Sequence, residues 1–169
     1  LHADIQCQIN TVELAFADLM AQKVAIHLRA GQFNEKVRGP LGNTSYAQAL
    51  PELPTPTDGR GVFVEPLDDI ATLWAKLNAA VGIPGFTGPL LLLGGYPLAD
   101  FTAALAALKT QFETVAKESL GVTLKIGDRN ALQDLIYPVL KVYRVTVPTF
   151  FPAGSPLITS LPKLTPEPG

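Results

Sequence analysis

The positions of the prolines constrain this chain most, because a proline inside a helix removes a backbone hydrogen bond and clashes with the preceding turn. The sequence has 15 prolines among 169 residues, and none of them falls within residues 4–29. Over that range apolar side chains recur at a spacing of three and four residues, which is typical of one face of a helix. The sequence therefore predicts a first helix over residues 4–29, with Gly31 as its stop signal.

Residues 30–65 differ in kind, since four prolines and several glycines interrupt any helical period there. Loops of this length without structure of their own are uncommon in compact domains. We therefore expect a long crossover that lies along the body of the molecule and is ordered by packing.

Three further helices are predicted from apolar stripes, over residues 66–81, 97–120 and 128–147. The first two begin with a proline, which suits the first helical position because its missing N–H would be unpaired there anyway. Asp128 is a suitable N-cap for the last helix. Pro138 lies inside that helix and predicts a kink or an earlier end. The stripe of the last helix consists of Leu132, Ile136, Val139 and Tyr143.

These elements predict an all-α fold: a four-helix bundle with a long crossover after the first helix and an extended, Pro-rich C-terminal tail. The helical domain would span residues 1–147, and the tail, residues 148–169, would pack on it or act as a linker. An α/β fold is the alternative, with short strands at residues 62–64, 90–93 and 122–126.

The composition indicates an apolar surface. Charged residues make up 17% of the chain, against roughly 25% in typical soluble domains, and the mean hydropathy is +0.24. With few charges to cover the surface, some apolar area is expected to be buried against a second molecule. The net charge of −2 and the lack of a basic cluster argue against nucleic acid and against an anionic membrane surface. We therefore predict a protein partner or self-association.

No motif for catalysis or cofactor binding is present. The sequence matches neither the nucleophile elbow nor the glycine-rich phosphate loops, so we predict no enzyme and no cofactor. His2, Asp4 and Cys7 can bind metals, but the other histidine, His27, lies about 35 Å away along one helix, so no metal site is predicted. A single cysteine fits the cytoplasm, and secretion after removal of a signal peptide is the alternative that the sequence leaves open.

A run of four leucines stands in the segment "GPLLLLGGYP", residues 88–97. Residues 77–99 carry no charge and are long enough to cross a bilayer, but their prolines and glycines prevent a continuous helix, so no transmembrane segment is predicted. Side chains of an extended segment alternate between two sides. If Leu90 and Leu92 face the core, their two neighbours need cover from the tail or from another molecule.

The candidate binding surface follows from this run and consists of Leu90, Leu91, Leu92, Leu93, Tyr96 and Trp74. The predicted function is a non-enzymatic structural or protein-interaction module, as a subunit of a larger assembly. The alternative is a helical bundle that binds a small molecule or lipid in a pocket at these residues. An enzyme of unknown class is the third hypothesis.

Two segments, "RNALQDLIYPVLKVYR" (residues 129–144) and "SLPKLTPEPG" (residues 160–169), resemble parts of uncharacterised bacterial helical-bundle proteins. In those proteins a Pro-rich tail often leads to a small β-sandwich domain. The resemblance covers mainly the last quarter of the chain. It implies a helical bundle and a linker cut from a longer chain, and it implies no activity and no site residues.

Overall fold

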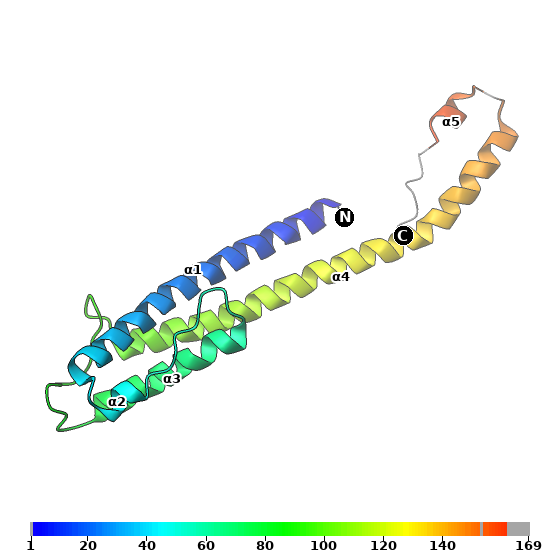
Figure 1. Cartoon of the computed structure of the whole chain (residues 1–169). Helices are drawn as coiled ribbons and strands as arrows, with labels where there is room; N and C mark the ends of the chain where they lie inside the picture. Colours follow the sequence, from blue (N-terminus) through cyan, green and yellow to red (C-terminus); the bar gives the residue numbers. More distant parts are fainter. Residues whose placement is uncertain (1, 153, 162–169) are drawn as a thin grey trace. The chain divides into compact units, whose positions relative to one another are not determined.

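The computed structural model describes residues 2–152 and 154–161, and this part of the chain is mostly helical (Figure 1). The helices are α1 (His2–Leu41), α2 (Ser45–Gln48), α3 (Arg60–Ala79), α4 (Leu98–Phe150) and α5 (Pro156–Thr159). The described residues contain no strand, only an isolated bridge between Leu92 and Tyr96. The all-α prediction is therefore confirmed. The α/β alternative is wrong, since residues 62–64 and 122–126 are helical.

The chain divides into two compact units, one of residues Ile9–Ser119 and one of Leu1–Gln8 together with Leu120–Gly169. Helices α1 and α4 contribute residues to both units. The predicted division after residue 147 depends on the Pro-rich tail, whose residues 153 and 162–169 lie outside the described residues. That division stays a prediction.

The core of the Ile9–Ser119 unit is built around Trp74 of α3. Its ring lies 5.2 Å from the ring of Phe33 in α1 and 5.7 Å from the ring of Phe101 in α4, measured between centroids. All three side chains are fully buried. Aromatic pairs at this separation add about 0.5–1.5 kcal/mol beyond the area they bury. One aromatic cluster therefore joins the three long helices.

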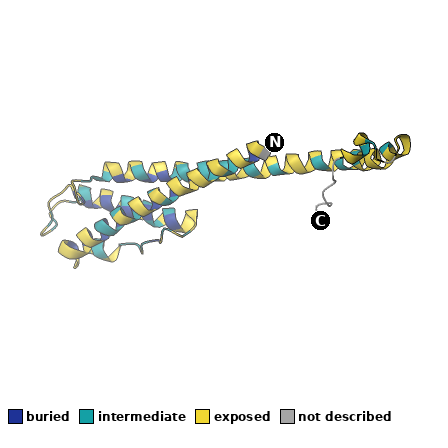
Figure 2. Cartoon of the chain, turned by 90° about the horizontal axis from the view of Figure 1, so that it is seen from above, coloured by how far each residue is buried: buried dark blue, intermediate teal, exposed yellow. Residues whose placement is uncertain are grey.

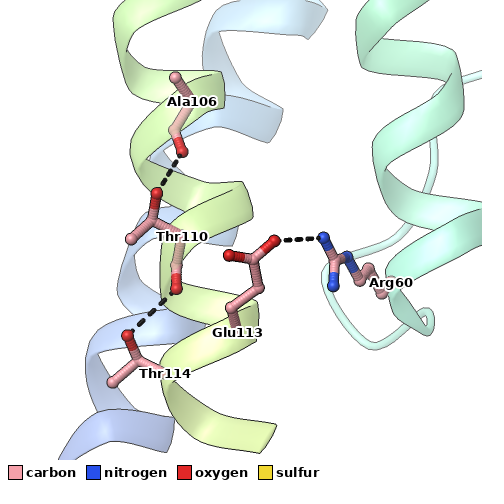
Figure 3. Close-up of polar contacts among 5 residues, drawn as sticks. All are labelled: Arg60, Ala106, Thr110, Glu113 and Thr114. Atoms are coloured by element: carbon pink, nitrogen blue, oxygen red, sulfur yellow. Dashed lines mark hydrogen bonds and ion pairs between the residues drawn. The ribbon is translucent and has the colours of Figure 1, made fainter. Parts of the chain in front are cut away.

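Polar contacts at the edge of this core link α3 to α4. Lys109 Nζ donates to Asp68 Oδ1 at 2.8 Å, and Arg60 Nη2 donates to Glu113 Oε1 at 3.0 Å (Figure 3). These side chains are substantially exposed, and exposed ion pairs are worth about 0–1 kcal/mol. The apolar core is therefore the main source of stability in this unit, and the ion pairs add little.

The crossover is ordered, as predicted, because three side chains of α1 bind its backbone carbonyls. Lys23 Nζ donates to the Asp58 carbonyl at 2.6 Å, His27 Nδ1 donates to Pro54 at 2.9 Å, and Asn34 Nδ2 donates to Pro51 at 3.5 Å. Burial lowers the pKa of the Lys23 ammonium below its ordinary value of 10.5, and Asp58 partly offsets this. Its positive charge also lies over the ring of Phe63, 4.7 Å from the centroid.

Helix α1 continues past the predicted stop at Gly31 and ends at Leu41. The apolar stripe goes on through Phe33, Val37 and Leu41, which are all buried. A glycine in a helix costs about 1 kcal/mol relative to alanine, and burial of these three side chains outweighs that cost. The crossover is correspondingly shorter than predicted.

Helix α3 begins at Arg60, earlier than the predicted start at Pro66, which lies inside the helix. The reason is Phe63, whose buried side chain extends the stripe of Leu67 and Ile70 by one turn. The proline is the seventh residue of α3, so it removes the hydrogen bond that an N–H at this position would donate to the Val62 carbonyl.

The predicted helices over residues 97–120 and 128–147 form one continuous helix, α4. The described residues therefore contain three long helices in place of the predicted four. Gly121 and Gly127 lie within α4, and Asp128, the predicted N-cap, is an interior residue of this helix. A Cβ atom on Gly121 would lie 3.4 Å from the Gln8 side chain of α1, which is an ordinary van der Waals contact.

Helix α4 also contains Pro138 and Pro148 and ends at Phe150. The ribbon bends in its yellow-to-orange part (Figure 1), as expected where a proline interrupts the hydrogen-bond ladder. Residues 148–150, predicted as the start of the extended tail, are thus helical. In the described part of the tail Ser155 caps α5 by accepting a hydrogen bond from the Leu157 N–H.

Candidate functional site

The connector between α3 and α4, residues 80–97, contains five of the six predicted binding residues. Leu90 and Leu92 are buried, whereas Leu91 is 44% exposed and Leu93 is 72% exposed. This is the alternation expected of an extended segment. Leu91 and Leu93 are therefore the two leucines that remain on the surface.

Trp74, the sixth predicted residue, is fully buried and holds the connector against α3. Its Nε1–H donates to the Leu90 carbonyl at 3.1 Å, and the Leu90 N–H donates to Asn78 Oδ1 at 2.8 Å. Trp74, Leu90 and Leu92 are thus part of the core, and their role in the structure is packing.

A tight turn closes the connector. The Leu92 N–H donates to the Tyr96 carbonyl at 2.9 Å, and the Gly95 N–H donates to the Leu92 carbonyl at 3.1 Å. Gly94 and Gly95 have φ angles of 81° and 75°, a region that side chains with a Cβ atom rarely adopt. The two glycines are therefore required for this turn.

Arg29 of α1 binds the outer side of the turn. Its Nη1 donates to the Leu93 carbonyl at 3.1 Å and to Gln32 Oε1 at 3.0 Å. Its guanidinium lies over the ring of Tyr96, 4.4 Å from the centroid. Burial raises the pKa of the Tyr96 hydroxyl above its ordinary value of 10.0; the charge of Arg29 opposes this rise and Asp100 adds to it. Arg29 is thus held in place by three contacts.

A cleft of about 370 Å³ lies beside Arg29, between α1 and α4. Its α1 wall carries Gln22, Ala25 and Ile26, and its α4 wall carries small residues, Ala104 and Ala107. The full lining, which we name the Arg29 cleft, is Gln22, Ala25, Ile26, Arg29, Tyr96, Ala104 and Ala107. Of the six residues predicted from the sequence, Tyr96 is the one that lines it.

A second surface lies on the C-terminal half of α4. None of its residues was among the six predicted binding residues. Large apolar side chains are exposed there at helical spacing, and we name this set the α4 apolar face: Leu132, Leu135, Ile136, Val139, Val142, Tyr143 and Phe150. Figure 2 shows this part of α4 mostly in yellow. Four of these residues, Leu132, Ile136, Val139 and Tyr143, form the apolar stripe of the predicted last helix, which the sequence analysis interpreted as the core-facing side of that helix.

Charged residues of the same helix segment lie on the other side. Lys141 follows Leu132 by about two and a half turns at 3.6 residues per turn and so lies opposite it, and Asp134 shares that side. Pro138, Val139, Val142, Tyr143 and Thr146 line a shallow hollow of about 520 Å³ along the apolar face. One side of the segment is therefore apolar and exposed, and the side of Lys141 also carries an exposed apolar residue, Val145.

Metal and membrane sites receive no support from the described residues. No group of three or more potential ligands gathers in that part of the chain, and the side chain of His2 lies outside it. His27 is engaged with the Pro54 carbonyl. No described helix combines the length and the apolar character needed to span a bilayer.

Comparisons with protein-family models, with curated proteins and with solved structures find no match to this chain. The similarity of residues 129–144 to uncharacterised bacterial helical proteins therefore stays an expectation from the sequence.

Proposed function

We propose that the chain is a non-enzymatic structural module that self-associates through the α4 apolar face. The observation that carries this proposal is the exposure of seven large apolar side chains on one side of a single helix segment. Exposed apolar patches of this kind mark interaction sites in soluble proteins. The low charge content of the chain supports the same conclusion.

The spacing of the face favours a helix as the partner. Within the face, Leu132, Leu135, Val139 and Val142 follow each other at intervals of three, four and three residues. This is the repeat by which two helices interlock their side chains along a common seam. In the described part of the chain α4 itself carries such an exposed stripe, and a second copy of α4 is the occupant we propose.

The energetics are sufficient for association. Fully burying one aliphatic or aromatic side chain contributes about 1.5–3 kcal/mol. Lost translational and rotational freedom costs about 4–15 kcal/mol or more. Partial burial of seven such side chains on each copy exceeds the lower part of that range. We therefore expect an oligomer at micromolar protein concentration.

Light scattering coupled to size exclusion tests this proposal. The unmodified chain is expected to give a mass that is a multiple of 18.0 kDa. Replacing Val139 and Val142 with aspartate buries charge in the seam and is expected to give the monomer mass. The control is Ala103→Asp with Ala106→Asp, which adds the same charge at exposed α4 positions in the Ile9–Ser119 unit. A strictly monomeric unmodified chain at micromolar concentration would contradict the proposal.

A further inference from the structure

We infer that the Arg29 cleft is a binding site for a small organic monocarboxylate with an apolar body. This goes beyond self-association, since the cleft belongs to the Ile9–Ser119 unit and shares no residue with the α4 apolar face. Three features support it: the shape of the cleft, the Arg29 guanidinium, which pairs with no described carboxylate, and the Gln22 amide, whose buried oxygen accepts no hydrogen bond from a described residue.

The shape of the cleft suits a small ligand. Its volume of about 370 Å³ lies at the lower end of the range of roughly 300–1,000 Å³ for small-molecule sites. Ala25, Ala104 and Ala107 leave the space that larger side chains would fill, and Ile26 adds an apolar wall. These residues would contact the apolar body of the ligand.

Arg29 supplies the charge that would select a carboxylate. It is the one charged residue that lines the cleft, and no carboxylate pairs with it in the described part of the chain. Both its hydrogen bonds use Nη1, so Nη2 and Nε remain as donors. A guanidinium presents such donors in a planar fork that matches the two oxygens of a carboxylate.

Arg29 is also preorganised. Gln32, the Leu93 carbonyl and the Tyr96 ring fix the guanidinium before any ligand arrives. A side chain that is already ordered loses less conformational entropy on binding. The contacts that hold the connector against α1 therefore also prepare the proposed site.

Gln22, seven residues before Arg29 on α1, provides a second polar group of the lining. Its Oε1 is buried and accepts no hydrogen bond from any described residue. An unsatisfied buried acceptor costs about 1–3 kcal/mol. Rotation of the amide exchanges Oε1 and Nε2, so Gln22 can turn either an acceptor or a donor toward the cleft. A carboxylate accepts hydrogen bonds only, so it would bond the Nε2 donor of Gln22.

A monoanion fits the cleft better than a phosphate ester. Phosphate sites commonly combine several cationic or backbone donors, whereas a single arginine lines this cleft and the chain as a whole is acidic. The tyrosine adds a neutral hydroxyl, which can donate to a carboxylate oxygen. The charge of the lining therefore matches one negative charge.

Two probes of equal shape test the inference, benzoate and its neutral analogue benzamide. Binding to the full chain is followed by backbone amide shifts in NMR spectra and by calorimetric titration. We expect saturable benzoate binding, with shifts confined to residues 22–29 and 96–107, and at least about tenfold weaker binding of benzamide, the effect of one charge-assisted contact. Inorganic phosphate is expected to bind more weakly than benzoate.

Variants of the lining residues test whether the preference for benzoate over benzamide depends on the Arg29 cleft. Arg29→Gln is expected to remove the preference for benzoate, and Arg29→Lys, which keeps the charge without the fork, to restore part of it. The control Arg60→Gln removes an arginine of the same unit that pairs with Glu113 and is expected to leave the preference intact. Ala25→Leu is expected to weaken both probes by filling the cleft.

Three results would overturn the inference: no saturable benzoate binding, equal binding of benzoate and benzamide, or an unchanged preference in a folded Arg29→Gln variant. Circular dichroism establishes that each variant is folded. Repeating the titration on the chain with Val139→Asp and Val142→Asp separates ligand binding from self-association, because those substitutions lie outside the Ile9–Ser119 unit.

Discussion

The N-terminal and C-terminal halves of α4 carry similar apolar stripes with opposite outcomes. Phe101, Leu105 and Leu108 are buried against α1 and α3, whereas Leu135 and Val139 are exposed. Both stripes recur at three- and four-residue spacing, so periodicity identifies a helix face without saying what covers it. The difference lies in the neighbours: the first stripe meets two helices of its own chain in the Ile9–Ser119 unit.

The largest loss of stability is expected when the aromatic cluster that packs against the first stripe is removed. Trp74→Ala removes the ring between Phe33 and Phe101 and leaves the Leu90 carbonyl without its donor. We expect a loss of about 3–5 kcal/mol in unfolding free energy. Denaturant unfolding followed by circular dichroism measures it. A loss below about 1 kcal/mol would show that the three helices do not depend on this cluster.

A matched leucine pair tests the comparison directly. Leu67→Ala is expected to cost about 2–5 kcal/mol because Leu67 is fully buried in α3. Leu135→Ala is expected to change the unfolding free energy of the monomer by less than about 0.5 kcal/mol, because this side chain is 72% exposed. Unfolding is measured at a protein concentration too low for association. Equal costs would mean that the α4 apolar face is covered by its own chain.

A glycine pair tests the connector turn. Gly94→Ala places a Cβ atom at a φ of 81° and is expected to cost about 1–2 kcal/mol. Gly61→Ala, in α3 with open space around it, is expected to stabilise the fold by about 0.4–1 kcal/mol. Thermal unfolding of the two variants shows whether each substitution raises or lowers the stability of the fold. A neutral Gly94→Ala would mean that the turn does not require its positive φ.

The smallest effect is the titration of Tyr96. Because burial raises its pKa in the folded state, the difference in phenolate absorbance between the unmodified chain and Tyr96→Phe should have its midpoint above 10.0. The folded-state pKa exceeds the unfolded one, so the stability that Tyr96 contributes is present below about pH 10 and is lost as pH rises through the folded pKa. In denaturant the midpoint should return to about 10.

The local elements were largely predictable from the sequence. Three helix segments are where the stripes placed them, and the start of α4 directly after Pro97 agrees with the preference of proline for helix starts. The alternation of Leu90 to Leu93 followed from extended geometry alone. Helix ends were less predictable, because the burial of Leu41 and Phe63 extended two helices beyond their sequence signals.

The sequence predicted the candidate sites less well than the helices. Tyr96 was predicted as a binding residue, but Arg29 was not, since its contacts with Leu93 and Tyr96 join positions more than sixty residues apart. The Arg29 cleft arises because small alanines of two distant segments face each other, and a single sequence gives no signal for that pairing.

The sequence alone was enough to predict that this chain is helical, that its leucine run cannot form a continuous helix, and that it carries few charges. These follow from local sterics, from side-chain periodicity and from composition. The packing of distant segments was needed to establish that α4 continues through Gly121, that Trp74 is a core residue, and which apolar stripe is left uncovered. Each of those outcomes depends on the packing free energy between distant segments, which outweighs the smaller local preferences of single residues.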